Sequence, residues 1–494
     1  MPRIARDDSL AHALGLESAD NLPFLDLSSG RPYTDRMKSL AMMVLVLLVS
    51  HPAFGACSDQ ERLLNVRKAA VAGLDSLAPS YLEDQNLEPG DIRQGRFHSS
   101  DNMRMQEVTL VLAFLYSEPL SKYHGQQDIL GSVLLSLDYM VRAQGSNGGF
   151  NEYQGWCGVP NRQEGKSSVT GFTLHSICRS LILLREDSAF QSRLKETIDT
   201  DGDGEADVSR HSAYASMLAK AMPAQFEGPG RGHAPNQDIG ALMAVIDLNE
   251  AYRKLMPGKP PLKTPKEIHA LRDEVFLARP MSPTKSPPGR WFSSKGMILE
   301  PGHGGTGYDA NYAGVSLHFM GLSGRDDPSI AQYSKRLWNG FQYFFVVENG
   351  VPRTELGIAR RQEGILGSIS PCYAGLTARC HPAANRVYGL ILKQFESDPA
   401  PFFRFASPHQ LQYAAYSYVD WLLNLELPKA STYRLPCERT EPFRYEDKEA
   451  GILVVKPENG VPTWWARPWD AEDQVRRHVY GRLPETLRAS GWPK

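Results

Sequence analysis

The residues with the clearest chemical signature form an acidic segment at positions 199–207, with the sequence DTDGDGEAD. Its five carboxylates alternate with small residues, a spacing that brings them onto one hard cation in calcium-binding loops, where Gly204 would allow the sharp turn. The expected ligands are Asp199, Asp201, Asp203 and Asp207. Because Arg210 stands where an EF-hand has its bidentate glutamate, we expect a shorter loop with a structural calcium ion. The alternative is a solvent-exposed acidic turn.

A second candidate is the glycine-rich loop at 230–238, GRGHAPNQD, which leads into an expected helix at 239–255. It places His233, Asn236 and Gln237 at the amino end of that helix, where the helix dipole favours an anionic group. In one interpretation these side chains face a cleft. In the other, a polar side chain of the loop simply caps the helix and the histidine lies on the surface.

A third segment, 300–312, also enters an expected helix and has the sequence EPGHGGTGYDANY. Glycines let the backbone approach a ligand closely, and tyrosine and histidine can transfer protons. The candidate residues are His303, Tyr308, Asp309, Asn311 and Tyr312. The alternative is a turn capped by its aspartate, with both tyrosines in the core.

Other candidate residues stand singly. Arg353 follows an Asn-Gly turn and is suited to binding a carboxylate, and Trp156 could stack on a sugar ring, although single aromatic residues usually belong to a core. Two expected helices are followed by Asn-Gly turns, at 147–148 and 349–350. These turns are either an internal repeat of helical hairpins or two unrelated helix ends.

Helical periodicity dominates the chain between these motifs and predicts a mainly α fold. Segment 103–116 is apolar on more than one face, so we expect it to be buried between neighbours. Residues 431–494 contain short strand-like stretches and too few apolar residues for a core of their own, which predicts a small cap. The expected helices are 59–77, 103–116, 129–144, 169–184, 213–221, 239–255, 313–321, 330–347, 383–395 and 409–427.

The first residues predict export. The apolar run 40–49 is too short to span a bilayer but matches a signal-peptide core, so we assign 37–56 as a signal peptide starting at Met37. Residues 1–36 are then a mis-assigned extension; the alternative is a cytoplasmic tail on an anchored protein. The segment before Cys57 resembles a bacterial lipobox. A periplasmic protein, an outer-membrane lipoprotein and a secreted protein all remain open, with membrane contact only through a lipid on Cys57.

Export permits disulfides among the six cysteines, but their pairing stays open. The pairs considered are Cys372–Cys380, Cys157–Cys178 and Cys57–Cys437. The composition, 41% hydrophobic and 22% charged, excludes a disordered chain. With 54 basic against 56 acidic residues, no basic excess exists to bind nucleic acid.

An exported helical chain whose polar, glycine-rich loops enter inner helices resembles the (α/α) toroid polysaccharide lyases, of the chondroitin AC/alginate lyase and heparinase-like type. The resemblance covers roughly residues 60–430 in organisation and is specific at 233–236 and 308–312. It implies a toroid or incomplete barrel of helical hairpins at 57–430, holding the calcium loop. The segment 431–494 is much shorter than the antiparallel sheet domain of many such lyases.

The resemblance also implies a reaction, β-elimination on a uronic-acid polymer. Neutralising the uronate carboxylate stabilises the enolate that develops when a base removes the adjacent proton. By resemblance, Asn236 and Arg353 would neutralise the uronate carboxylate. His233 would be the base, and Tyr308 or Tyr312 would be the acid. The remaining substrate-binding candidates are Gln237, His303, Asp309, Asn311 and Trp156. The expected partner is an acidic polysaccharide or oligosaccharide, bound by a monomer.

Two other functions stay open. A glycoside hydrolase on the same scaffold would need two carboxyl groups beside the scissile bond. The first candidates are Asp238 and Asp309, with Glu152 and Glu355 as substitutes. A non-catalytic glycan-binding or scaffold lipoprotein would need only aromatic side chains on a concave face.

Overall fold

The computed structural model describes residues 58–98, 103–150, 170–226, 235–278, 292–302, 305–307, 310–354, 365–404, 408–460 and 462–466. The chain divides into two units, Met1–Ser58 and Asp59–Lys494, and the second holds the described helices and strands. The expected extension, the signal peptide and Cys57 lie outside the described residues. Within the described residues, no helix is long and apolar enough to cross a membrane.

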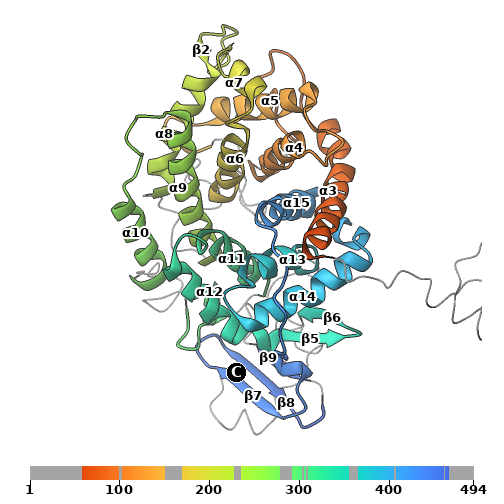
Figure 1. Cartoon of the computed structure of the whole chain (residues 1–494). Coiled ribbons are helices and arrows are strands. Elements are labelled where there is room, and N and C mark those ends of the chain that lie inside the picture. The colour runs from red at the N-terminus through yellow and green to blue at the C-terminus, as the bar shows by residue number, and fades with distance from the viewer. Residues whose placement is uncertain are drawn as a thin grey trace, which may run out of the picture. The chain divides into compact units, whose positions relative to one another are not determined.

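The second unit is mainly helical, as the periodicity predicted. Six of its helices contact one another in chain order, and the last of them also contacts the first. Figure 1 shows this succession around the centre of the unit. We call them the inner helices: α4 (Val108–Ser117), α6 (Thr170–Leu184), α9 (Pro235–Leu255), α11 (Ala310–Ser323), α13 (Ile365–Thr377) and α15 (Pro408–Leu423).

A second set of helices packs on the inner ones from outside (Figure 1). Each contacts the inner helix that neighbours it in the chain, and α14 also contacts α3. These outer helices are α3 (Asp59–Glu83), α5 (Gln127–Ala143), α8 (Arg210–Phe226), α10 (Pro265–Asp273), α12 (Pro328–Phe341) and α14 (Pro382–Ser397). Shorter helical segments are η2 (Met103–Glu107), α7 (Ser188–Arg193), η3 (Glu274–Ala278), η4 (Gln342–Phe344), η5 (Ala400–Phe403) and η6 (Pro436–Glu438).

The pattern of burial explains the two sets. In α4 every residue from Val108 to Tyr116 is buried, which confirms the prediction for this apolar segment. The outer helices α12 and α14 instead keep one buried face. The expected helix 103–116 begins as the 3₁₀ segment η2, where Gln106 accepts from the Phe97 backbone N–H and donates to its carbonyl.

Short antiparallel pairs join the helices, namely β1 (Thr197–Ile198) with β2 (Val208–Ser209), β3 (Glu300–Gly302) with β4 (Gly305–Gly307), and β5 (Phe345–Glu348) with β6 (Val351–Thr354). In the glycine-rich segment, residues 300–302 and 305–307 thus form an antiparallel pair before α11. The expected helix 330–347 ends early, because the apolar, β-branched residues after η4 form β5.

The carboxyl-terminal sheet contains β7 (Phe443–Asp447), β8 (Ile452–Lys456) and β9 (Thr463–Ala466), all antiparallel. Its inner face joins the helical core: the Tyr445 ring stacks on Tyr343 at 4.5 Å, and the Trp464 indole donates to the Tyr343 carbonyl at 2.9 Å. This sheet thus shares the hydrophobic core of the helices.

The expected Cys372–Cys380 disulfide is not formed, and both residues are free thiols. Helix α13 continues to Thr377, so a helical rise of about 1.5 Å per residue separates the two positions instead of a closed loop. Burial also raises the pKa of the Cys372 thiol. Cys178 and Cys437 are free as well, whereas Cys57 and Cys157 lie outside the described residues.

The amino end of α14 makes a pH-dependent contribution to stability. His381 is 7% exposed, and its Nδ1 accepts a hydrogen bond from the Ala383 backbone N–H at 3.0 Å. Its Nε2 therefore carries the proton and donates to Asn339 Oδ1 at 3.1 Å. Burial and the nearby Lys335 lower its pKa to about 4.

We predict that His381→Asn flattens the fall in stability between pH 6.5 and pH 4. In the wild type the unfolded chain takes up the proton near pH 6.5 and the folded chain only near pH 4. Stability therefore falls as the pH falls through this window, by up to about 3 kcal/mol. Asparagine keeps the cap without titrating. Urea unfolding of both proteins across the window checks this, and parallel pH profiles would contradict it.

Candidate functional site

The residues predicted from sequence divide into those that the structure describes and those that it does not. Asn236, Gln237, Tyr312 and Arg353 are described, as are the four aspartates of the acidic loop. Only the backbone of Asn311 is described. Outside the described residues lie Trp156, His233, His303, Tyr308 and Asp309, together with Glu152 and Glu355.

Asn236 and Tyr312 lie near the amino ends of two neighbouring inner helices, α9 and α11. Both are buried, at 4% and 7% exposure. One cavity is lined by residues 242–250 from the middle of α9 and by Leu322 and Ser323 at the carboxyl end of α11. Among the described residues, Asn236 Oδ1 has no hydrogen-bond partner.

Arg353 lies apart from this pair. It is on β6, which contacts the outer helix α14, and its side chain is 64% exposed. Its ion-pair partner is Glu348 on the facing strand β5, at 3.5 Å. Gln237, next to Asn236 on α9, is only partly buried.

The acidic loop connects β1 to β2 and is organised around Asp199. Its Oδ1 accepts from the backbone N–H of Gly202 at 2.6 Å, and its Oδ2 accepts from that of Gly204 at 2.9 Å. Burial opposes ionisation slightly, but these bonds lower the pKa of Asp199. Carboxylate oxygens of Asp199, Asp201 and Asp203 lie within 4.8 Å of one another. Asp207, the fourth expected ligand, is outside this group.

A cluster of four titratable residues that the motifs did not indicate lies among the inner helices. It consists of His175 on α6, Asp247 on α9, His318 on α11 and Asp420 on α15, all at most 1% exposed. We call it the central cluster. Each residue interrupts an otherwise apolar stretch, for example Leu317-His318-Phe319, and this interruption is the only sequence signal for it.

His175 is the hub of the central cluster. Its Nδ1 lies 2.5 Å from Asp247 Oδ2, and its Nε2 lies 2.9 Å from Asp420 Oδ2. His318 Nε2 reaches the same Asp420 oxygen at 2.8 Å. Burial disfavours the imidazolium, but the two carboxylates outweigh it and raise the pKa of His175 to about 10. In the same way, burial is outweighed at Asp420, whose pKa the two histidines lower.

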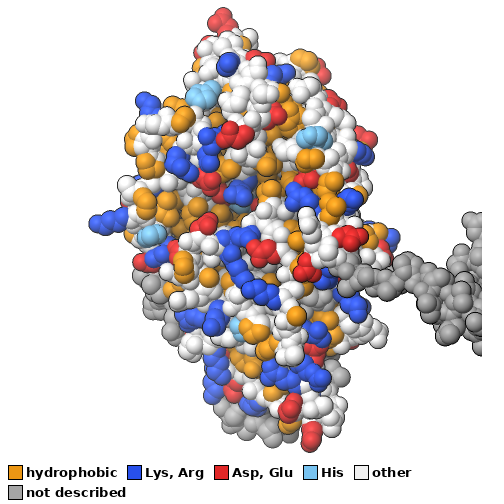
Figure 2. Space-filling view, in the orientation of Figure 1, with side chains coloured by type: hydrophobic (Ala, Val, Ile, Leu, Met, Phe, Trp, Pro, Cys, Tyr) orange, Lys and Arg blue, Asp and Glu red, His pale blue; other side chains and the backbone are white. Residues whose placement is uncertain are grey.

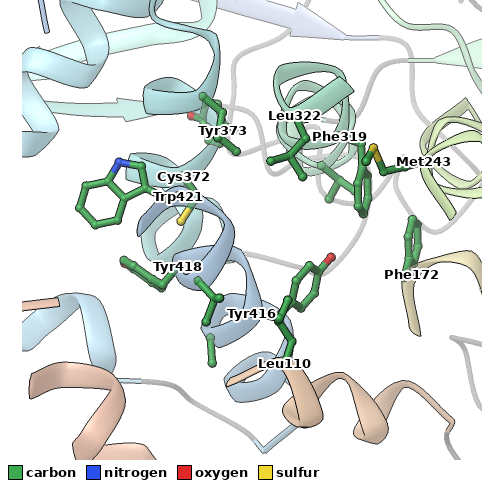
Figure 3. Close-up of a cluster of buried hydrophobic side chains, with 14 of the residues drawn as sticks. Leu110, Phe172, Met243, Phe319, Leu322, Cys372, Tyr373, Tyr416, Tyr418 and Trp421 are labelled. Carbon is green, nitrogen blue, oxygen red and sulfur yellow. The ribbon is translucent and has the colours of Figure 1, made fainter. Parts of the chain in front are cut away.

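Aromatic rings enclose the cluster. The ring centroids of Phe319 and His175 are 5.6 Å apart in an edge-to-face contact, and those of Phe319 and Phe172 are 5.3 Å apart in a stack. The Tyr416 ring contacts the rings of His175 and His318. Figure 3 shows Phe172, Phe319 and Tyr416 converging from three inner helices. The rings exclude water, so charges here interact in a low-dielectric environment.

One side of the cluster adjoins a cavity of about 340 Å³. Asp247 forms part of its wall, together with Arg179, Glu250, His269 and Arg272. Burial disfavours the charge of Arg179, but Asp247, Asp420 and Glu250 raise its pKa. Figure 2 shows basic and acidic side chains interspersed over the face drawn in Figure 1.

No protein-family model matches the chain, and no curated protein is significantly similar to it in sequence. The function therefore has to be argued from the residues themselves. Two places in the structure bear on the function: the amino ends of the neighbouring helices α9 and α11, and the central cluster.

Proposed function

We propose that this chain is an exported polysaccharide-degrading enzyme, a lyase that cleaves a uronic-acid polymer by β-elimination. The observation that carries the proposal is the buried amide of Asn236 at the amino end of α9. The neighbouring helix α11 bears Tyr312. Both residues belong to the glycine-rich segments, 230–238 and 300–312, that resemble those of the toroid lyases. The proposed site is the end of the inner helices where these segments enter.

The arrangement of the helices supports the (α/α) toroid that this function implies. The inner helices contact one another in a closed circuit, and the outer helices pack against them. Each outer helix is joined in the chain to an inner neighbour, which is the organisation of helical hairpins packed side by side.

The chemistry assigns a role to each group. The Asn236 amide would donate a hydrogen bond to the uronate carboxylate and stabilise the enolate as it forms. His233 would remove the proton next to that carboxylate, and Tyr312 or Tyr308 would protonate the leaving oxygen. Arg353 is a weaker candidate for neutralisation, because it pairs with Glu348 on an exposed hairpin.

We predict that Asn236→Ala lowers the rate of elimination by about 10²–10³, the usual loss for one such donor. The protein is offered alginate, pectate, chondroitin, hyaluronan, heparan and glucuronan, and the ultraviolet absorbance of the unsaturated product is followed with the reducing ends. Asn249→Ala is the matched control, because Asn249 lies at the far end of α9 and accepts only from the Lys263 backbone. Equal losses in both variants would contradict the role of Asn236.

A glycoside hydrolase is the second candidate, because Asp238 is fully buried in the first turn of α9, beside the same amino end. Hydrolysis needs a second carboxyl group, for which Asp309 is the candidate. New reducing ends without absorbance would favour this function, and the absence of both signals would favour the glycan-binding protein.

We also propose that the acidic loop binds a structural calcium ion. Calcium should raise the thermal midpoint by roughly 2–5 °C, because an ion that binds only the folded state stabilises it. Asp199→Ala should abolish the shift, since Asp199 organises the loop. Asp207→Ala should retain most of it, because Asp207 is outside the converging trio. A calorimetric scan with and without calcium tests this, and an unchanged wild-type midpoint would exclude the site.

A further inference from the structure

We propose that the central cluster is a binding site for one divalent transition-metal ion, with His175, His318 and Asp420 as ligands and zinc as the best match. The three residues come from α6, α11 and α15, and their ligand atoms lie within 4.8 Å of one another. Two imidazoles and one carboxylate are a donor set that suits zinc and related ions. This inference does not depend on the proposed reaction.

The distances fit a metal centre. Both Nε2 atoms approach the same oxygen, Asp420 Oδ2, at 2.9 and 2.8 Å. Ligands at about 2.0–2.2 Å from a tetrahedral zinc ion lie roughly 3.3–3.5 Å from one another, so the side chains need to move by only a few tenths of an ångström. Three protein ligands leave a fourth position for water or for the second oxygen of Asp420.

The surroundings of His175 are those of a metal ligand. Asp247 Oδ2 lies 2.5 Å from its Nδ1, which holds the proton on that nitrogen and points the Nε2 lone pair at the site. Such a carboxylate–histidine pair orients the ring and strengthens the ligand. Asp247 is therefore a positioning residue that acts through His175.

Unsatisfied polar atoms are the second, independent observation. Among the described residues, Asp420 Oδ1, Asp247 Oδ1 and His318 Nδ1 are buried without a hydrogen-bond partner. Each such atom costs about 1–3 kcal/mol, so three in one cluster call for an explanation. A bound ion, with its water, would satisfy the carboxylate oxygen of Asp420.

The competing explanation is a network without metal, in which a proton on His175 Nε2 takes the place of the ion. Both arrangements fill the same position, and metal binding would release that proton. Asp247 also lines the cavity of about 340 Å³, so the cavity adjoins the cluster on that side.

The experiment measures metal content and affinity in the whole protein. Elemental analysis of the purified protein is followed by removal of metal with a chelator and calorimetric titration with Zn²⁺. We expect about one equivalent, and Co²⁺ in its place should give the visible absorption of a site with nitrogen ligands. A wild-type protein that binds no zinc after chelation, and gains no thermal stability from it, overturns the proposal.

Single substitutions test which residues bind the zinc ion. His318→Gln and Asp420→Asn should weaken zinc binding at least 100-fold, and Asp247→Asn should weaken it by 10–100-fold, as expected for a residue that orients a ligand. His269→Gln is the matched control, since His269 lines the cavity but is not in the cluster. Asp199→Ala removes the acidic loop as an alternative site and should leave the cobalt spectrum unchanged. Zinc binding that survives His318→Gln and disappears in Asp199→Ala also overturns the proposal.

Discussion

Replacing Asp138 by alanine is expected to lower the free energy of unfolding by about 3–5 kcal/mol, the largest effect that we predict for an ion pair. The change leaves the guanidinium of Arg210 buried without its main partner. Arg210 Nε donates to Asp138 Oδ1 at 3.0 Å, and Nη2 donates to Oδ2 at 2.9 Å. Urea unfolding monitored by circular dichroism measures the loss.

The expected loss is large because Asp138 serves a second buried donor. The Tyr214 hydroxyl donates to Asp138 Oδ1 at 2.6 Å. Burial, reinforced by Asp138, raises the pKa of Tyr214, so this hydroxyl keeps its proton. Asp138 and Tyr214 are at most 3% exposed and Arg210 is 8% exposed, so water cannot replace the lost carboxylate.

Two controls separate this explanation from a simple loss of side-chain volume. The double variant Asp138→Leu with Arg210→Met removes both charges, and we expect it to be more stable than Asp138→Ala. Glu348→Ala breaks the exposed Arg353–Glu348 pair, which is independent of Arg210, and should cost less than about 1 kcal/mol. A double variant as unstable as the single one would contradict the assignment.

The same ion pair illustrates how much the sequence could predict. The expected helix 129–144 nearly matches α5 (Gln127–Ala143), because its apolar residues recur with helical spacing. That Asp138 on α5 meets Arg210 on α8 could not be predicted, because the partners are 72 residues apart and no local pattern joins them. The central cluster was missed for the same reason, since its bonds join residues up to 245 positions apart.

Features that depend on residues close together in the chain could, in contrast, be predicted from the sequence. The acidic loop converges as its spacing indicated, because its hydrogen bonds join residues at most five positions apart. Asn236 could be selected as a candidate from sequence because the glycine-rich loop and the helix start are adjacent in the chain. The pairing of Cys372 with Cys380, one of those considered, is not formed because the intervening residues continue a helix, and a helix separates residues that a loop would bring together.

The two Asn-Gly turns are alike in sequence but differ in structure. At 349–350 both residues have positive φ, +51° and +79°, and the turn closes the β5–β6 hairpin. At 147–148 only Gly148 has positive φ, +82°, and the turn docks on α8. There Gln144 Nε2 donates to the Gly148 carbonyl at 3.1 Å and to the Met217 carbonyl at 2.9 Å. The turns therefore differ in local conformation, although both follow an outer helix, α5 or α12.

Because the two turns differ, we expect Gly148→Ala and Gly350→Ala to lower the free energy of unfolding by different amounts. A Cβ on Gly148 would lie 1.9 Å from the Lys220 carbonyl oxygen, whereas a Cβ on Gly350 meets nothing within 4 Å. Gly350→Ala should therefore cost only about 1 kcal/mol, the strain of a positive φ. Gly148→Ala adds a backbone clash and should cost roughly 2–5 kcal/mol, because the turn must move away from α8. Urea unfolding of the two variants side by side measures both values. Equal losses would mean that the turn at Gly148 yields without disturbing α8, and that its docking contributes little to the stability of the fold.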